Sequence, residues 1–521
     1  MDKEKSRKEM KEKEPEKRNR KSDEERFSEY SEKLEREYRE KLLEHRKKME
    51  ERRKLRQKKL KLHCFLFLFF LAAVIAAAVF AFPRLRSHLT FPAAGSKAAK
   101  TTAAPQTEKS SAVPEESSTE DNKAEILGKA ELLAKQYDYD GAEELLKNSA
   151  YAEDAEFSAK LSELEAAKAA LVQADNTKIP HVFFHSLIVD TTRALTEDKM
   201  GKAYNAAMTT IPEFEAILKE MYERGFVMVH LHDIASLETQ EDGTKKMVQK
   251  KIMLPEGKKP FVMSEDDVNY YEYMTGHGFA DKMVLDDVGK PTLQYTDSEG
   301  KVTTGDYDIV PILDKFVAEH PDFAYHGHKA IIALTGYNGT LGYRTDETYD
   351  ANSGKLDPKN RANPSIEEDR ETVKKITAAL KEDGYEFASH SWGHINFTNR
   401  SLEDLTTDTE KWKRNVEPLL PDPCDILIYP FGADIKGWHV YNHAEDAKFN
   451  MLEEHGFHYF CNVDSSQYWV QYGDDFMRQG RRNLDGYRLY EAFSGQADHV
   501  SDLMDVKKVF DQRRPTPISW Q

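Results

Sequence analysis

The sequence predicts an α/β domain with a parallel sheet, open or closed, over residues 178–521. After Asn176, short apolar runs alternate with longer segments of helical periodicity, which is the pattern of βαβ units. The apolar runs occupy residues 181–189, 225–234, 259–267, 330–339, 385–394, 425–432 and 456–464. Five of them end in polar, charged or glycine residues, and the reactive groups of such folds gather beyond the carboxyl ends of the strands.

The charge of the chain is distributed very unevenly. The formal charge is −17, with about +8 in residues 1–64 and about −25 in the remainder. Because a phosphate-binding protein needs a basic face, this distribution argues against nucleic acid as the partner of the C-terminal domain. The cysteines are Cys64, Cys424 and Cys461. The last two either pair or, as we favour, remain free buried thiols.

The N-terminal region predicts a membrane anchor. Residues 1–62 form a charged segment that we expect to be a solvated helix. The run Cys64–Phe82 carries no charge and is long enough to cross a bilayer. Ten basic and two acidic residues occupy 46–61, just before it. The positive-inside bias therefore predicts a transmembrane helix over 63–83, with the N-terminus in the cytoplasm and the following domain outside the cell membrane. A cleaved signal peptide is the alternative, but a leader of this length would be far too long.

Two segments separate the predicted anchor from the α/β domain. Residues 84–121 are rich in Ala, Ser, Thr, Pro and Lys, and this composition predicts a disordered linker. Helical periodicity returns in residues 122–175. They resemble about one and a half tetratricopeptide units, so we expect a small helical spacer rather than a repeat array.

Two histidines and two aspartates predict a metal site. His390 and His394 are four residues apart, so in a helical turn both imidazoles would project from one face. An aspartate from another strand end would complete a site that borderline divalent metals accept. Asp266 and Asp267 end an apolar run, where burial is costly unless a cation compensates it. The alternative is that these are unrelated surface groups.

A third candidate is the turn Tyr429–Gly432. The run 425–432 ends in Tyr-Pro-Phe-Gly, which predicts a rigid turn with a free backbone N–H after the proline. Such an N–H can stabilise a developing oxyanion.

In this order, the three pieces resemble the motifs of the polysaccharide deacetylase family, also called NodB-homology or carbohydrate esterase family 4. They read SEDDV (264–268), HSWGH (390–394) and IYPFG (428–432). The resemblance implies a distorted (β/α) barrel that removes N-acetyl or O-acetyl groups from a cell-envelope or extracellular polysaccharide. It also implies a divalent metal ion, with zinc preferred over cobalt, manganese or nickel.

The resemblance assigns roles to individual residues. Asp266 would be the catalytic base. Asp267, His390 and His394 would bind the metal, and the backbone N–H of Phe431 would hold the tetrahedral intermediate. The predicted substrate contacts are Tyr429, Pro430, Trp392, Tyr270 and Arg482. Tyr271, Tyr273 and Tyr343 also fit sugar stacking, although a core position is the commoner role of such residues.

The chain departs from the family pattern at several positions. Glu265 and Val268 replace the usual aromatic residue and glycine, and Ile428 stands where many members have the arginine that steadies the base. Arg481 or Arg482 could supply that cation, unless they are a surface pair. The closing Leu-x-His motif, which provides the general acid, is not evident. The candidate acid is His185; the weaker candidates are His499, His326 and His328.

Two other functions remain open from the sequence. A non-catalytic glycan-binding or scaffold protein on a degenerate barrel would explain Ile428 and the missing final motif, but not the complete set of aspartates and histidines. A glycoside hydrolase would use two carboxylates across the sugar instead of a histidine pair.

Overall fold

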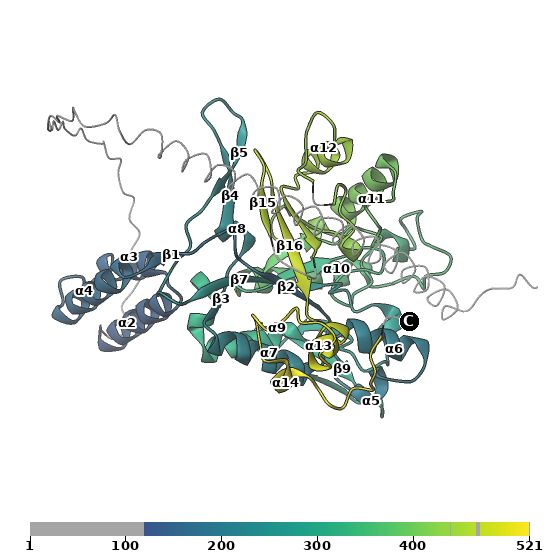
Figure 1. Ribbon diagram of the computed structural model, residues 1–521, viewed down its shortest axis with the longest axis horizontal. Helices are drawn as coiled ribbons and strands as arrows, with labels where there is room; N and C mark the ends of the chain where they lie inside the picture. The colour runs from purple at the N-terminus through teal and green to yellow at the C-terminus, as the bar shows by residue number, and fades with distance from the viewer. Residues whose placement is uncertain (1–118, 438, 465–468, 520–521) are drawn as a thin grey trace, which may run out of the picture. The chain divides into compact units, whose positions relative to one another are not determined.

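The computed structural model describes residues 119–437, 439–464 and 469–519 (Figure 1). The predicted cytoplasmic segment 1–62, the anchor 63–83 and nearly all of the linker 84–121 lie outside these residues. Among the described helices, none has both the length and the apolar character that a membrane span requires.

The first described elements are three helices that pack on one another. They are α2 (Thr119–Lys135), α3 (Tyr139–Lys147) and α4 (Ala155–Ala169). The Asp138 and Asp154 side chains cap α3 and α4 by accepting hydrogen bonds from the backbone N–H groups of Gly141 and Glu156. The helices share a small core of their own, formed by Ala130, Ala142, Leu146, Phe157 and Leu164.

A closed parallel barrel forms the centre of the main domain. Its strands pair in the order β11–β12–β13–β14–β16–β2–β7, and β7 pairs again with β11, so the sheet has no open edge there. All of these pairings are parallel. The prediction of an α/β barrel is therefore confirmed. The strands are β2 (His181–His185), β7 (Lys259–Asp266), β11 (Ile331–Leu334), β12 (Glu386–Ser389), β13 (Ile426–Ile428), β14 (Tyr459–Val463) and β16 (Met477–Asn483).

One barrel strand, β16, was absent from the predicted runs. Its sequence MRQGRRN is polar, yet all seven residues are buried. Buried arginines need charged partners that come from distant parts of the chain, and the sequence of β16 alone does not show them. Two further strands flank the barrel: β3 (Phe226–Met228) runs parallel to the start of β7, and β15 (Val470–Tyr472) runs antiparallel to β16.

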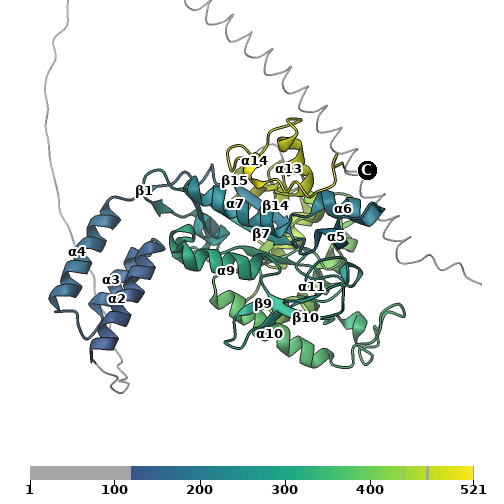
Figure 2. The same ribbon diagram turned by 90° about the horizontal axis from the view of Figure 1, so that it is seen from below.

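Helices lie around the strands in both ribbon views (Figure 1 and Figure 2). Between helices and strands, side chains such as Phe184, Phe214 and Leu313 form the larger core, whereas Val262, Ile331 and their neighbours belong to a separate cluster. The main-domain helices are α5 (Thr191–Ala194), α6 (Lys199–Ala207), α7 (Ile211–Glu223), α8 (Leu231–Ile234), α9 (Ile309–Glu319), α10 (Ile366–Glu382), α11 (Leu402–Asn415), α12 (Ala447–Glu454), α13 (Gly486–Phe493) and α14 (Val506–Val509).

Small antiparallel sheets decorate the barrel. A three-stranded sheet lies in the long segment between the two halves of the predicted metal site, and two pairs lie elsewhere. The three-stranded sheet contains β8 (Lys282–Leu285), β9 (Pro291–Thr296) and β10 (Val302–Gly305); the pairs are β4 (Ala235–Thr239) with β5 (Lys245–Gln249), and β1 (Val172–Gln173) with β6 (Met253–Leu254). Cys424 and Cys461 are free, buried thiols, as favoured from the sequence.

Candidate metal and catalytic site

The predicted site residues meet at the carboxyl ends of the barrel strands. Asp266 is the last residue of β7 and lies opposite His185, the last residue of β2, in the parallel register. His390 directly follows β12, and Tyr429 directly follows β13. Strand pairing thus brings together segments that are far apart in the sequence, at the end where parallel sheets carry reactive groups.

Asp267, His390 and His394 form a candidate metal centre. Each offers a ligand atom within 4.8 Å of those of the other two. His394 Nε2 lies 3.5 Å from Asp267 Oδ2. Two imidazole nitrogens and one carboxylate oxygen are a donor set that suits a borderline divalent ion such as Zn²⁺.

Hydrogen bonding and burial prepare the histidines as ligands. His390 donates its Nδ1–H to the backbone carbonyl of Ile428 at 2.8 Å, so its Nε2 is left as the unprotonated nitrogen. Burial lowers the pKa of His394 to about 4, so this ring is neutral near pH 7. Burial alone would raise the pKa of Asp267. The neighbouring imidazoles, of which His394 contributes most, outweigh the effect of burial and lower this pKa. The residues present therefore fit a divalent metal ion.

The histidines are presented by an irregular turn, which corrects the expected helical turn. Residues 390–398 contain no helix, and Ser391 and His394 have left-handed φ angles of 60° and 50°. The carboxylate of Asp408 on α11 accepts hydrogen bonds from the Trp392 and Gly393 N–H groups, both at 2.8 Å. These bonds hold the turn in a backbone conformation that is rare for residues with a side chain.

The carboxylate of Asp266 forms a buried ion pair with Arg481 on β16. The two guanidinium nitrogens lie 2.7 and 2.9 Å from the two carboxylate oxygens. Arg481 also donates to Ser264 Oγ at 3.0 Å. Burial would raise the pKa of Asp266, but the Arg481 guanidinium outweighs it and holds that pKa far below its usual range. Asp266 is therefore ionised, as a proton acceptor must be, and Arg481 supplies the cation that Ile428 cannot.

Arg482 lies elsewhere, which corrects its prediction as a substrate contact. Successive residues of a strand point in opposite directions, and Arg482 pairs instead with Asp502, at 2.9 Å for both nitrogen–oxygen distances. It also donates to the backbone carbonyl of His499 at 3.1 Å.

Three other predicted substrate contacts are buried in the core. The Tyr429 hydroxyl lies 2.8 Å from that of Tyr441, and its ring packs on Phe397. Pro430 and the side chain of Tyr270 are buried as well. The pKa of Tyr270 is raised by its burial and then by Asp308 and Glu265, so its hydroxyl faces those carboxyls. Only Trp392 of the predicted substrate contacts remains partly exposed beside the site.

Phe431 and His185 lie next to the candidate metal ligands. Phe431 has a left-handed φ of 59°, and its ring meets that of His394 edge to face, with centroids 4.3 Å apart. The imidazole of His185 contributes to lowering the pKa values of both Asp266 and Asp267, so it faces the pair. Its position, one strand away in register with Asp266, places it at the same end of the barrel as the aspartate pair.

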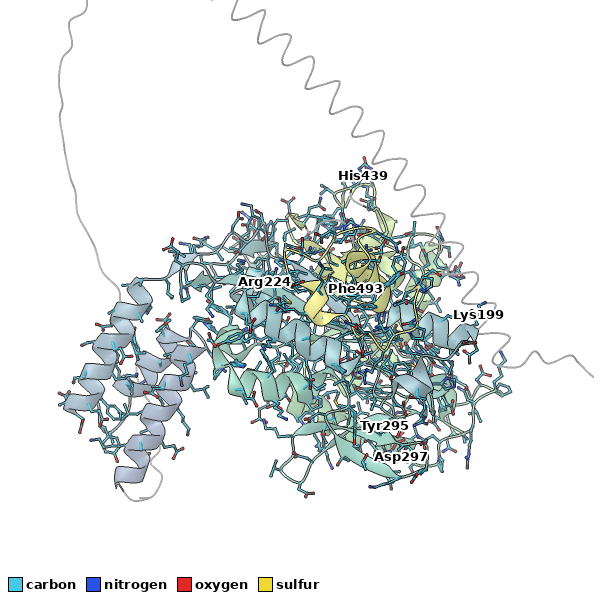
Figure 3. All side chains as sticks on the ribbon, turned by 60° about the horizontal axis from the view of Figure 1, so that its bottom comes forward. Lys199, Arg224, Tyr295, Asp297, His439 and Phe493 are labelled. Carbon is cyan, nitrogen blue, oxygen red and sulfur yellow. The ribbon has the colours of Figure 1, made fainter. Side chains whose placement is uncertain are left out.

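The other candidate acids lie away from this site. His328 lies shortly before the start of β11, at the opposite end of the barrel, where it is 2.6 Å from Asp233. His326 lies beside it, with ring centroids 5.9 Å apart. His499 contributes its backbone carbonyl to Arg482. His439, which was not among the predicted acids, follows the Phe431 turn in sequence, and its side chain is exposed and projects outward (Figure 3).

One supporting residue had been considered only as a stacking surface. Tyr271 donates its hydroxyl to Asp267 Oδ1 at 2.6 Å and lies 2.8 Å from Thr335 Oγ1. The sequence shows the tyrosine but not this contact, because the chain turns sharply between the two residues: Tyr270 and Asp267 both have left-handed φ angles. Asp408, which fixes the histidine turn, is one of several acids on α11, and nothing in its sequence context distinguishes it.

Residues 348–459 match the family model described as polysaccharide deacetylase, a range that includes His390, His394 and Phe431. None of the curated proteins compared with the chain matches it.

Solved structures that match include a Streptococcus pyogenes deacetylase in complex with acetate. The two sequences are 13% identical, the match covers 61% of this chain and 95% of that chain, and the TM-score is 0.32. A de-N-acetylase from Aggregatibacter actinomycetemcomitans has 12% identity, 59% and 95% coverage, and a TM-score of 0.32. A mutant of a carbohydrate esterase family 4 pseudoenzyme also matches, with 11% identity, 37% and 74% coverage, and a TM-score of 0.17.

Proposed function

We propose that this chain is a metal-dependent hydrolase that removes N-acetyl or O-acetyl groups from a polysaccharide, since residues 348–459 match the polysaccharide deacetylase model. One observation carries the proposal: Asp267, His390 and His394 converge with ligand atoms within 4.8 Å, while the ion-paired carboxylate of Asp266 lies alongside. This arrangement supplies both a divalent-metal donor set and an ionised base.

The chemistry follows from the positions of these groups. A divalent ion held by Asp267, His390 and His394 would polarise the acyl carbonyl and lower the pKa of water in the site. Asp266 accepts the proton of the attacking water, and Arg481 keeps this carboxylate ionised and oriented. The backbone N–H of Phe431 stabilises the oxyanion. His185 protonates the leaving nitrogen or oxygen.

We further propose that the enzyme works outside the cell membrane on a cell-envelope or extracellular glycan. The charge-free run Cys64–Phe82 and the basic segment before it support a single span with a cytoplasmic N-terminus. The acidic composition of the following chain fits a substrate that is not a polyanion.

A direct test combines metal content with acetate release. We expect the wild-type protein to bind one divalent ion per chain and to release acetate from at least one member of a panel of acetylated glycans, without new reducing ends. Asp267→Ala and His394→Ala should each lose the ion, because two ligands cannot hold it tightly. Metal retained in both variants would refute the ligand assignment, and new reducing ends would indicate a glycoside hydrolase.

The second candidate is a non-catalytic glycan-binding or scaffold protein on a degenerate barrel. It is favoured by one sequence observation, the absence of the closing Leu-x-His motif that usually provides the acid. A folded wild-type protein that binds no stoichiometric metal and releases no acetate would establish this candidate instead.

A further inference from the structure

A hydrogen-bond network crosses the inside of the barrel and ends on the ion pair of the proposed base. It begins at Gln479 on β16, whose side-chain oxygen lies 3.1 Å from His181 Nδ1 on β2. His181 Nε2 lies 3.0 Å from Ser264 Oγ on β7. Ser264 Oγ accepts a hydrogen bond from Arg481 Nη1 at 3.0 Å, and Arg481 pairs with Asp266. We call Gln479, His181 and Ser264 the interior network.

Strand register brings these side chains together. His181 lies opposite Arg481 in the parallel pairing of β2 with β16. Side chains two positions apart on a strand point the same way, so Gln479 lies on the side of Arg481, and Ser264 on the side of Asp266. These five residues are at most 2% exposed. Bulk water therefore cannot replace a hydrogen bond that the network loses.

The direction of each hydrogen bond in the interior network is fixed from one end. The amide nitrogen of Gln479 donates to the backbone carbonyl of Ile179 at 2.9 Å, so its amide oxygen faces His181 and accepts from Nδ1–H. Burial, and then the charge of Arg481, lower the pKa of His181 well below its usual value, so the ring carries no second proton. Its Nε2 therefore accepts the hydroxyl proton of Ser264.

This direction decides what Ser264 offers to Arg481. A serine hydroxyl can rotate, and can either donate or accept. Because the ring of His181 holds the proton, the oxygen of Ser264 presents only lone pairs to the guanidinium. Arg481 is then held by Ser264, by both oxygens of Asp266 and by the face of the Phe183 ring, whose centroid lies 4.2 Å from the guanidinium carbon.

We propose that His181 is a positioning residue for the base: through Ser264 it fixes Arg481, and through Arg481 it fixes the carboxylate of Asp266. This inference rests on the proposed function and adds to it residues that touch neither the candidate metal ligands nor a reacting atom. His181 is the first residue of β2, whereas the site lies at the other end of that strand. A displacement of about 1 Å far from the chemistry can cost roughly a hundredfold in rate, so a base that is oriented by a long arginine side chain benefits from such an anchor.

The first test measures turnover of 4-nitrophenyl acetate. His181→Phe keeps a planar ring but can neither donate nor accept, and Ser264→Ala removes a single oxygen. We expect each variant to lower kcat by roughly tenfold to a hundredfold and to leave KM within about twofold of the wild-type value. His181→Gln should recover most of the lost rate, because its amide oxygen can accept the Ser264 proton. Should His181→Phe fail to fold, Ser264→Ala makes the same test.

A second measurement separates positioning from a general loss of stability. If His181 acts only through the base, His181→Phe should not further lower the residual kcat of Asp266→Asn. A further loss in that background would overturn the positioning role. The matched control is His458→Phe, since His458 is also buried and donates to the Asp475 backbone carbonyl at 3.1 Å. This control should leave kcat unchanged.

Nitrogen NMR of histidine-labelled protein tests the interior network without turnover. We expect the ring of His181 to be neutral with its proton on Nδ1, and its signals are assigned by their absence in His181→Gln. Ser264→Ala should shift the Nε2 signal, because this nitrogen loses its donor. A charged ring, or a neutral ring with the proton on Nε2, would overturn the network.

The outcomes distinguish this inference from the proposed function. Acetate release by the wild type, with unchanged kcat in His181→Phe and Ser264→Ala, would overturn the positioning role and leave the deacetylase proposal standing. If the wild type releases no acetate from any acetyl compound, the deacetylase proposal fails. The guanidinium N–H signals of Arg481 then decide whether His181 fixes this side chain: they should shift in His181→Phe and not in His458→Phe, and unshifted signals would overturn the inference.

Discussion

At the scale of single residues, the ion pair of Asp266 with Arg481 decides whether the site has a base. A carboxylate this deeply buried would bind a proton at neutral pH without a cation beside it. Arg481 makes two nearly equal contacts, at 2.7 and 2.9 Å, and so fixes the orientation of the carboxylate as well as its charge.

Asp266→Asn should keep the bound metal and lose most of the turnover. The amide cannot accept a proton from water, and loss of a general base costs roughly 10²- to 10⁴-fold. The measurement is kcat on the best acetylated glycan together with metal content. Asp502→Asn is the matched control, because it disturbs the pair of the adjacent Arg482 outside the site and should leave kcat unchanged. An active Asp266→Asn variant would rule out this base.

The sequence predicted these residues unequally well. Asp266, Asp267, His390 and His394 stand in short motifs, so their local spacing was sufficient to identify them as candidate site residues. Arg481 and Arg482 are neighbours in the sequence, and only the direction in which each leaves β16 decides which one reaches Asp266. Tyr429 stands inside a motif and Tyr270 stands shortly after one, yet their side chains point into the core. Motif position alone does not show which side of the backbone a side chain occupies.

At the scale of secondary-structure elements, the turn after β12 depends on α11. Asp408 is the buried acceptor for two N–H groups of this turn, and those N–H groups belong to residues between the two histidines. The apolar run that forms β12 was visible in the sequence, whereas the geometry of the following turn depends on Asp408 of α11, about fifteen residues later.

Asp408→Asn should therefore weaken both fold and metal site. The asparagine side chain has only one oxygen acceptor, so one N–H is left without a partner, at a cost of about 1–3 kcal/mol in the free energy of unfolding. We expect lower metal affinity, measured by competition with a chelator, and a lower urea midpoint. Asp404→Asn, on the exposed first turn of α11, should change neither quantity. Unchanged metal affinity in Asp408→Asn would show that the turn is held without this carboxylate.

The opposite end of the barrel predicts a pH-dependent stability. His232 after β3 contacts Glu386 at the start of β12 and lies 3.1 Å from Asp425 before β13. Burial opposes protonation of His232, but Glu386 and Asp425 outweigh it and raise its pKa to about 10. The stabilisation is complete below the unfolded-state value near 6.5 and is lost as the pH rises toward 10. The free energy of unfolding, measured with urea, should fall over this interval.

The matched variant is His232→Gln, which cannot carry the charge. It should be less stable than the wild type at pH 6 and should show a flatter profile between pH 6.5 and 10. His439→Gln, at an exposed position, should keep the wild-type slope. Equal slopes in wild type and His232→Gln would exclude His232 as the source.

At the scale of the whole molecule, the α/β class could be predicted because alternation of apolar runs with helices is a property of long stretches of sequence. This alternation left the sheet open or closed, and only the family resemblance implied a barrel, because closure rests on two residue pairs between β7 and β11. The small sheet of β8, β9 and β10 lies in the long segment between Asp267 and His390. The sequence shows the length of this segment but did not predict its three strands.

Removal of residues 1–92 should give a soluble domain with full activity on small acetyl substrates. All the site residues lie beyond residue 180, and the predicted anchor is removed. The activity of the truncated protein is measured on 4-nitrophenyl acetate. Cell fractionation shows whether the full-length protein is found in the membrane or the soluble fraction. A folded but inactive truncated protein would show that the N-terminal segment does more than tether the domain.

The distance in sequence between Asp266 and its cation has a consequence for biosynthesis. The two residues are 215 positions apart, so a nascent chain that has emerged only as far as β14 would bury a negative charge without compensation if the barrel tried to close. Catalytic competence should therefore arise in one late step, once nearly the entire domain has left the ribosome, and partial products of translation should be inert.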